Sequence, residues 1–327
     1  ARGVGENYFM KEMSRPDYKM IFPEFADYTP AYSQSHKPVR EQTTAEGHAV
    51  RAVYLYCAMA DLAEAYQDEG LLKACKTLWN NIVEKRMYLT GGIGSSGHLE
   101  RFTVDYDLPN EYNYSESCAS IGLALFGLRM AQITGESQYM DVAERALYNT
   151  VLAGIALDGK SFFYVNPLEV WPPACMEGTS KKHVKPIRQK WFGVACCPPN
   201  IARTLASMGQ YIYFTDKNTV YVNLYISNEA QIDLNEGTTK IQIESDLTNT
   251  GHIVLKVTPD EGSTNNLAIR IPDYVKAYTI RKDGALLEHQ DICQAYLTIG
   301  GISKQTEIVI DFEVPARFVR ANPNVRE

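Results

Sequence analysis

The spacing of apolar residues changes along this chain from a helical period to a strand period, and this change limits the fold to two kinds of domain in series. Up to about residue 214, apolar side chains recur every three or four positions, as between Gly47 and Ala63 and between Leu71 and Ile82. From Thr219 onward they alternate with other residues, which is typical of strands with one buried face. The sequence therefore predicts a helical domain over residues 1–215 and a β domain over residues 216–327.

The first half contains further helix signals and two long connections. Helices are predicted over 117–134, where Gly135 ends the helix, over 137–153, and from just after Pro198-Pro199 to about Phe214. The connections over 90–114 and 157–195 are long for a compact domain, and loops of that length are usually functional. Helices in series with alternating long and short loops favour antiparallel helix pairs, as in an α/α toroid.

Short alternating runs fill the second half. Their apolar positions are Val220, Val222, Leu224 and Ile226, then Ile253, Leu255 and Val257, then Leu267, Ile269 and Ile271, and finally Ile308, Ile310 and Phe312. Turn sequences such as Lys282-Asp283-Gly284 separate such runs and indicate an antiparallel β-sandwich. The predicted fold class is thus α+β and multidomain, an α/α toroid followed by an antiparallel sandwich.

Two adjacent cysteines, Cys196 and Cys197, stand just before a predicted helix N-terminus. Neighbouring cysteines pair with each other only through a strained peptide, so a shared soft metal such as zinc is one interpretation. Glu116 and Cys118 would complete a set of four ligands. The other interpretation is that these thiols are small buried hydrophobic side chains. The helix dipole would lower the pKa of a thiol at that position.

The remaining cysteines and the composition narrow the class of protein. Cys57 and Cys75 fall on apolar helix faces, which favours packing over chemistry. Seven cysteines without a disulfide-type spacing favour a reducing compartment, so we expect a cytoplasmic protein. A net charge of -7 with a pI near 5.5 argues against nucleic-acid binding. No membrane association is expected, because no apolar run approaches the roughly 20 residues that span a bilayer.

The glycine-rich segment 91–110 carries carboxylates that suit acid/base chemistry, namely Glu100, Asp105 and Asp107. It is not a phosphate-binding loop, since no Lys-Ser or Lys-Thr follows the glycines. Aromatic residues are dense around it and in the second long connection. Aromatic rings beside carboxylates suit sugars, whose C–H faces stack while their hydroxyls form hydrogen bonds, although a single tyrosine is more often a core residue.

Several blocks together resemble glycoside hydrolase family 127 and the related family 146, which contain β-L-arabinofuranosidases. The blocks are Arg40-Glu-Gln with Gly47-His-Ala-Val-Arg-Ala, Asp105-Tyr-Asp-Leu-Pro, Glu116-Ser-Cys with Ile121-Gly, and Val194-Ala-Cys-Cys-Pro-Pro-Asn-Ile-Ala-Arg. They occur in order along nearly the whole chain. The resemblance implies an (α/α)6 barrel with β-sandwich domains and a zinc-dependent retaining hydrolase of β-L-arabinofuranosyl residues.

The same resemblance implies a role for individual residues. Glu116, Cys118, Cys196 and Cys197 match the zinc ligands, and Cys196 also matches the catalytic nucleophile. Glu100 matches the general acid/base. His48 and Tyr164 fall where the family has sugar-contacting residues, so an arabinofuranosyl oligosaccharide or glycoconjugate is the expected partner.

One feature departs from the family pattern. The barrel needs about twelve helices, and about five or six are recognisable here. We therefore expect a fragment that lacks the first part of the barrel and the chain beyond the first sandwich. Half a toroid exposes apolar faces, so either self-association or a complement for the missing half is expected.

Two other functions remain open from the sequence. The first is a non-catalytic carbohydrate-binding or scaffold protein with a structural zinc, because a set of three cysteines and one glutamate is already full. The second is another α/α-toroid enzyme, such as a glycuronyl hydrolase or sugar epimerase, in which the cysteines are incidental. Glu100 discriminates against the first, since a structural site needs no acid, and a metal assay discriminates against the second.

Overall fold

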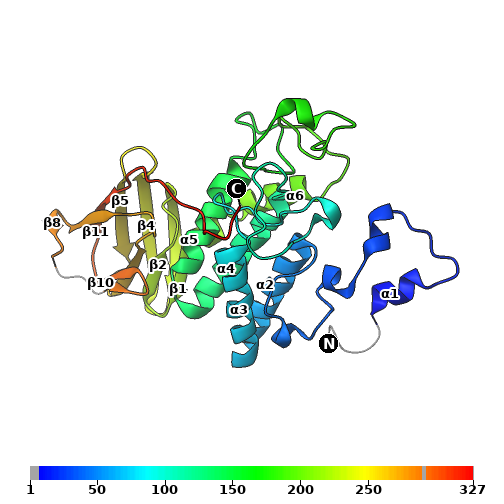
Figure 1. The fold of residues 1–327 in the computed structure, drawn as a ribbon. Helices are drawn as coiled ribbons and strands as arrows, with labels where there is room; N and C mark the ends of the chain where they lie inside the picture. Colours follow the sequence, from blue (N-terminus) through cyan, green and yellow to red (C-terminus); the bar gives the residue numbers. More distant parts are fainter. Residues whose placement is uncertain (1–6, 289–291, 327) are drawn as a thin grey trace. The chain divides into compact units, whose positions relative to one another are not determined.

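The structure is a computed structural model that describes residues 7–288 and 292–326. The chain divides into two compact units (Figure 1). One comprises Ala1–Ile133, Val142–Thr204 and Ala321–Glu327, and the other comprises Thr134–Asp141 and Leu205–Arg320. The first unit is helical and the second holds two β-sheets, which confirms the predicted fold class of a helical domain followed by a β-sandwich.

The helices carry the site on their ends and on the loops between them. The α-helices are α1 Tyr8–Met13, α2 Ala49–Ala65, α3 Glu69–Lys85, α4 Ser117–Thr134, α5 Gln138–Arg145, α6 Cys197–Ala206 and α7 Gly209–Ile212. Short 3-10 turns lie at Pro23–Asp27, Pro30–Ser33, Val39–Glu41, His98–Glu100 and Pro172–Cys175. α2 and α3 pack on each other, and side chains at their N-caps, His48 and Asp68, accept backbone N–H groups of the first turn.

Helix α4 is the buried helix of this unit. Tyr56 of α2 and Trp79 of α3 both place their rings against Phe126. Gly122 lets α2 approach, because a Cβ there would lie 2.3 Å from Val53 Cγ2. Among the helices of the described residues, α4 alone is long and apolar enough to cross a membrane, and 78% of it is buried inside the protein. The expectation that no run approaches spanning length is thus wrong for α4, whose burial is typical of a core helix.

Two predicted helices differ from the structure. The helix predicted over 137–153 ends at Arg145 and continues as a π-helical segment, Ala146–Leu152, which periodicity cannot distinguish from an α-helix. The helix predicted to reach Phe214 ends at Ala206, and β1 already begins at Tyr213. The prediction was too long there because apolar residues recur at Met208, Tyr211 and Ile212 on the way into β1, although Ser207, Gly209 and Gln210 lie between them.

The strands form two sheets with the orders β1-β2-β6-β10-β9 and β3-β4-β5-β11-β7-β8. Their bounds are β1 Tyr213–Asp216, β2 Thr219–Val222, β3 Asn228–Leu234, β4 Gly237–Asp246, β5 His252–Pro259, β6 Asn265–Arg270, β7 Ala277–Lys282, β8 Ala285–Leu286, β9 Ile292–Cys293, β10 Tyr296–Ile302 and β11 Thr306–Glu313. The predicted alternating positions of β5 and β11 are buried, which confirms the period-two interpretation. The predicted run 220–226 is a strand only to Val222.

One strand pair corrects the expectation of a purely antiparallel sandwich. β2 and β6 pair in parallel, with Val220 opposite Leu267 and Val222 opposite Ile269. The chain leaves the first sheet after β2, forms β3, β4 and β5 in the second sheet, and then returns to the first. Such a crossover delivers the returning strand in the same direction, whereas a hairpin would reverse it.

A buried ion pair lies inside the second unit. The side chain of Arg270 on β6 is fully buried; its Nε donates to the Asn223 carbonyl at 2.7 Å, and its Nη1 pairs with Asp141. Asp141 comes from the segment Thr134–Asp141, which belongs to this unit although it lies far away in the sequence. The pair therefore fastens that segment to the sheet.

Candidate metal centre and active site

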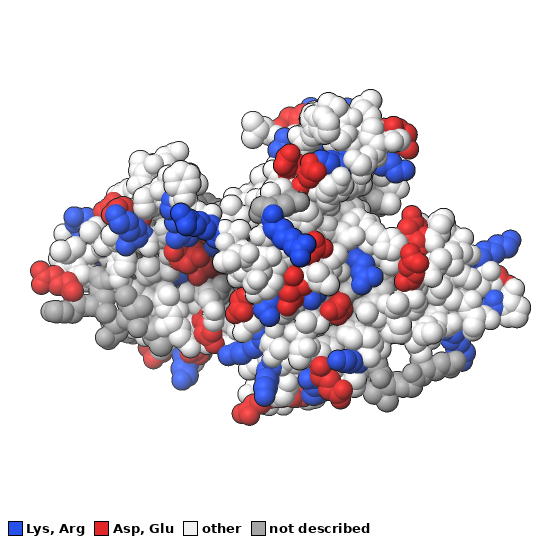
Figure 2. Space-filling view, viewed as in Figure 1, with Lys and Arg blue, Asp and Glu red and all other residues white. Residues whose placement is uncertain are grey.

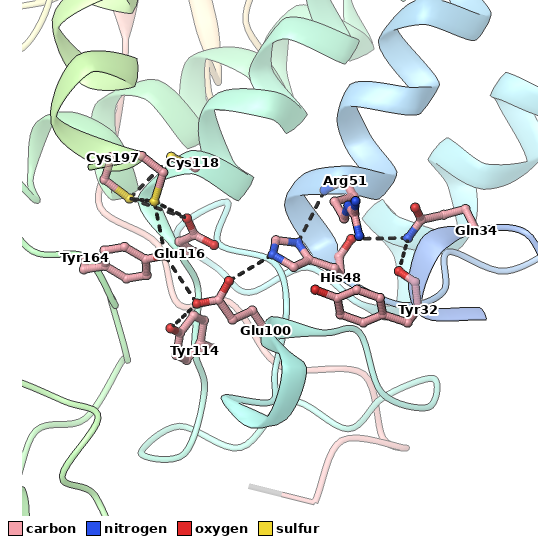
Figure 3. Close-up of polar contacts among 11 residues, drawn as sticks. Tyr32, Gln34, His48, Arg51, Glu100, Tyr114, Glu116, Cys118, Tyr164 and Cys197 are labelled. Carbon is pink, nitrogen blue, oxygen red and sulfur yellow. Dashed lines mark hydrogen bonds and ion pairs between the residues drawn. The ribbon is translucent and has the colours of Figure 1, made fainter. Parts of the chain in front are cut away.

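The four residues predicted as metal ligands lie together (Figure 3). Glu116 and Cys118 stand at the start of α4, while Cys196 directly precedes α6 and Cys197 is its first residue. The Sγ atoms of Cys118 and Cys197 are 3.4 Å apart, and those of Cys196 and Cys197 are 4.0 Å apart. Glu116 Oε1 lies 3.6 Å from the Cys196 sulfur and 3.5 Å from the Cys197 sulfur. Two helix N-termini thus bring these side chains to one point.

These spacings fit a tetrahedral metal ion. Sulfur ligands about 2.3 Å from a tetrahedral zinc stand roughly 3.8 Å from one another, close to the observed separations of sulfur and oxygen atoms. Glu116, Cys118 and Cys197 are buried, and Oε2 of Glu116 has no hydrogen-bond partner. Three thiols around a buried carboxylate are a donor set that a soft divalent ion satisfies. The cluster can therefore hold a metal.

The cluster concentrates negative charge in a buried place. Burial, with the nearby charges of Glu100 and Cys196, raises the pKa of Glu116 to about 8. Hydrogen bonds from Cys118 and Cys197 lower the pKa of the Cys196 thiol, and contacts with Cys196 raise the pKa of both neighbours. Each charge in the cluster therefore opposes the ionisation of its neighbours.

Glu100 faces this cluster from the glycine-rich loop. Tyr114 OH donates to Glu100 Oε1 at 2.7 Å, Tyr164 OH lies 3.3 Å from the same oxygen, and His48 Nε2 is 2.9 Å from Oε2. Burial raises the pKa of Glu100, but the contacts with His48, Tyr114 and Tyr164 outweigh it, so the pKa lies below the ordinary value. Leu99 and Glu100 both have left-handed backbone, with φ of 55° and 50°, which is costly for residues other than glycine.

Tyr164 connects the acid to the thiols. Its hydroxyl lies 3.3 Å from the Cys196 sulfur as well as 3.3 Å from Glu100 Oε1. A backbone bridge between Glu116 and Val165, and a hydrogen bond from Ser117 N to the Tyr164 carbonyl, hold the Tyr164 segment beside the start of α4. The structure thus brings together the predicted residues Glu100, Tyr164 and Cys196.

Family models match both halves of the chain. Residues 5–210 match the family model of the β-L-arabinofuranosidase GH127 catalytic domain, and residues 219–315 match that of the GH127 middle domain. The chain belongs to glycoside hydrolase family 127.

Solved and curated members of family 127 are similar over nearly the whole chain. A non-reducing end β-L-arabinofuranosidase from Bifidobacterium longum subsp. longum is 37% identical over 336 residues, which cover 99% of this chain and 50% of the relative. The structure of a GH127 β-L-arabinofuranosidase from Geobacillus stearothermophilus T6 matches with a TM-score of 0.91 and 43% identity. The match covers 99% of this chain and 51% of that protein. The structure of a further GH127 β-arabinofuranosidase matches with a TM-score of 0.84 and 37% identity. This match covers 93% of this chain and 48% of that protein. This family 127 chain spans about half the length of these relatives.

Two predicted acid/base candidates lie outside the site of this family 127 chain. Asp105 accepts Arg86 Nε at 2.7 Å and Asn81 Nδ2 at 3.0 Å, so it neutralises a buried guanidinium. Asp107 lines a separate open pocket of about 590 Å³ with residues 104–109, Asn324 and Arg326. Of the three carboxylates in the glycine-rich segment, Glu100 is the one that contacts Tyr164, whose hydroxyl also contacts Cys196.

Several residues of the site were not assigned from the sequence. Tyr114 was noted only as one of many aromatics, and Tyr32, whose ring meets that of His48 edge-on at 5.8 Å, was not noted. Asn200, on the first turn of α6 and in hydrogen-bonding contact with Cys118, was also missed. Their contacts with Glu100, His48 and Cys118 leave no recognisable pattern in the sequence, because each contact joins a different pair of segments. Cys57 and Cys75 are buried core thiols, as predicted, and burial raises the pKa of each to about 12.

Proposed function

We propose that this chain carries the catalytic centre of a zinc-dependent retaining glycoside hydrolase that releases β-L-arabinofuranosyl residues. The observation that carries the proposal is the single hydroxyl of Tyr164, which contacts both the Cys196 sulfur and the Glu100 carboxylate at 3.3 Å. A nucleophile and an acid/base must flank one glycosidic bond, and contact of both groups with one hydroxyl supports such an arrangement. A purely structural metal site has no use for Glu100. The proposed sugar, a β-L-arabinofuranosyl residue, is taken from the names of these relatives.

The metal proposed for the cluster is zinc, held by Glu116, Cys118, Cys196 and Cys197. Cysteine sulfur with a carboxylate oxygen is a ligand set that zinc favours. When bound, zinc would keep the sulfur ionised at neutral pH and moderate its charge. The position of Cys196 also helps, since it is the exposed member of the pair, at the N-terminus of α6, where the helix dipole favours an anion.

The reaction proceeds in two displacements at the anomeric carbon. In the first, Cys196 Sγ attacks that carbon, the glycosidic C–O bond breaks, and Glu100 gives its proton to the departing oxygen. In the second, the Glu100 carboxylate takes a proton from water, the water oxygen bonds to the anomeric carbon, and the C–S bond breaks. The sulfur leaves as a thiolate and Glu100 regains its proton, so sulfur, carboxyl and proton return to their starting states.

Glu100 must therefore change its protonation state during turnover. In the free site, hydrogen bonds from Tyr114 and contacts with His48 and Tyr164 favour the carboxylate, which is the form needed in the second step. A bound sugar that excludes water would increase burial, and burial is the influence that raises the pKa of this group. His48 and Tyr164 are proposed to bind sugar hydroxyls, which would draw part of their hydrogen bonding away from Glu100.

The test combines metal analysis with an activity assay on the reduced chain. We expect one zinc per chain and hydrolysis of an aryl β-L-arabinofuranoside with retention of configuration. Cys196→Ser should abolish hydrolysis, because serine has no stabilised thiolate. Cys175→Ser is the matched control, since Cys175 is a free buried cysteine of the described residues outside the cluster. Unchanged turnover in Cys196→Ser would mean that the thiol pair is structural.

A further inference from the structure

A second group of metal-binding side chains adjoins the thiol cluster. One ligand atom each from His48, Glu100 and Glu116 lie within 4.8 Å of one another. His48 Nε2 and Glu100 Oε2 are 2.9 Å apart, and both side chains are largely shielded from solvent. An imidazole with two carboxylates is a set that holds a divalent ion in proteins.

The carboxylate of Glu116 has one oxygen for each group. Its Oε1 lies next to the sulfurs of Cys196 and Cys197. Its Oε2 is buried and has no hydrogen-bond partner, and Figure 3 shows the other end of this carboxylate turned toward Glu100 and His48. Glu116 itself is only 4% exposed, so this oxygen is shielded from bulk solvent. A buried acceptor without a partner is costly, and a cation would remove that cost.

The charge of the whole site favours the same conclusion. Three thiolates with Glu116 and Glu100 carry five negative charges when all are ionised, and one divalent ion in the thiol cluster offsets two of them. Like charges that share a buried place must either take up protons or bind a counter-ion. A second divalent ion beside Glu100 would supply that counter-charge.

We propose that His48 Nε2, Glu100 and Glu116 Oε2 form a second, weaker site for a divalent ion, with zinc as the natural candidate, and that Glu116 bridges it to the thiol cluster. The ion occupies the place of the sugar beside Glu100 and so excludes it. Excess zinc is then an inhibitor. This inhibitory consequence rests on the proposed function, whereas the binding of the ion does not.

Binding sets a condition on the imidazole of His48. Nδ1 now accepts the Arg51 backbone N–H at 3.4 Å, which leaves the proton on Nε2. An ion at Nε2 needs the proton on Nδ1, so the Arg51 N–H must give up this acceptor. The bond is at the long end of hydrogen-bond geometry, and its loss exposes the N–H to water at a helix end. The rearrangement makes the second site weaker than the thiol cluster.

Cobalt titration of the reduced chain separates the two sites, because sulfur ligands give cobalt an intense charge-transfer absorption and nitrogen or oxygen ligands do not. We expect a first equivalent with this absorption and a second equivalent that binds without adding to it. Glu100→Gln and His48→Asn should each lose the second equivalent and keep the first. His98→Asn is the control, since His98 lies on an exposed ion pair with Asp27 and should keep both.

The first equivalent also shows that each variant is folded at the thiol cluster. A parent chain that stops at one equivalent would overturn the second site, as would a second equivalent that survives in both variants. A chain whose first equivalent lacks the sulfur absorption would overturn the metal centre of the proposed function instead. In hydrolysis assays, zinc beyond one equivalent should raise KM without changing kcat, and a fall in kcat alone would contradict exclusion of the sugar.

Discussion

Asn200 is expected to control how tightly the thiol cluster holds its metal. Its carboxamide oxygen accepts hydrogen bonds from Tyr54 OH at 3.1 Å and from Arg203 Nε at 2.7 Å. Because the oxygen is occupied by these two donors, the NH₂ group is the part left to meet Cys118. The Cys196 thiolate and other contacts raise the pKa of Cys118, while the hydrogen bond from Asn200 lowers it. Asn200 thus links the Arg203 guanidinium to the Cys118 sulfur.

Replacing Asn200 with alanine removes one hydrogen bond to a charged sulfur and leaves the helix intact. Bonds to charged groups contribute about 1.5–3 kcal/mol, and loss of a partner that orients a metal ligand typically costs about 10–100-fold in affinity. The two magnitudes agree, since tenfold corresponds to about 1.4 kcal/mol. We therefore expect Asn200→Ala to weaken zinc binding by about 10–100-fold. Asn200→Asp should weaken zinc binding at least as much, because the aspartate side chain has no N–H to donate and adds negative charge.

Competition between the reduced chain and a chromophoric zinc chelator measures this affinity directly. Asn149→Ala is the matched control, since the Asn149 amide bonds only to the Arg145 carbonyl on an exposed surface among the contacts described. Circular dichroism checks that the helices are unchanged. Zinc affinity of Asn200→Ala within twofold of the parent would refute the reasoning, because Cys118 would then be held without the carboxamide.

Three further predictions concern carboxylates, those of Glu100, Asp141 and Asp105. Glu100→Gln should lower the hydrolysis rate by roughly 10²–10⁴-fold for a poor leaving group and by less for glycosylation with an activated aryl group, as steady-state kinetics would show. Asp141→Ala removes the buried ion pair with Arg270 and should destabilise the sandwich by about 3–5 kcal/mol, as seen in hydrogen exchange of β6 and β10. The hydrogen bond from Arg86 holds the pKa of Asp105 below its usual range although burial raises it, so this stabilisation is present above about pH 4 and is lost as pH falls through the depressed value. Asp105→Asn should therefore reduce the loss of stability at acid pH, when the free energy of unfolding by urea is measured against pH.

Two of these predictions, those for Asp141 and Asp105, have a matched comparison on the chain. For Asp141, the control is Asp61→Ala, which breaks an exposed pair with Arg129 and should cost at most about 1 kcal/mol. For Asp105, the control is Asp107→Asn in the same loop, which should leave the loss of stability at acid pH unchanged. An Asp141 variant with sandwich exchange like the parent, or an equal loss of stability at acid pH for parent and Asp105→Asn, would count against the roles assigned to Arg270 and Arg86.

The sequence predicted the two-part fold because burial leaves a period in apolar residues. Ile253, Leu255 and Val257 alternate in the sequence and are all buried on β5. The hairpin of β3 and β4 lacks so clean an alternation and was not predicted. The extent of the fifth helix was wrong for a related reason, since apolar residues continue past Ala206 while the backbone changes from helix to strand.

The site was predictable only in part, and chiefly through the family resemblance. The thiol pair with Glu116 and Cys118 stands out because four metal-type ligands occur in two short segments. Polar side chains that contact those ligands do not recur at a regular spacing in the sequence. Tyr54 and Asn200 are 146 positions apart, and nothing local in either segment indicates their contact. The structure was needed to show that Asp105 accepts a hydrogen bond from Arg86. It was also needed to show that Glu100 and Cys196 contact the same hydroxyl of Tyr164.

The backbone at Glu100 explains why this carboxylate, and not its neighbours, reaches the thiols. Leu99 and Glu100 are both left-handed, and each such residue costs of order 1–3 kcal/mol unless its surroundings hold it there. The surroundings are hydrogen-bonding groups on the Glu100 carboxylate itself, from Tyr114, Tyr164 and His48. The strain is therefore offset by the same contacts that orient the acid, so placement of Glu100 and its chemistry depend on one set of bonds.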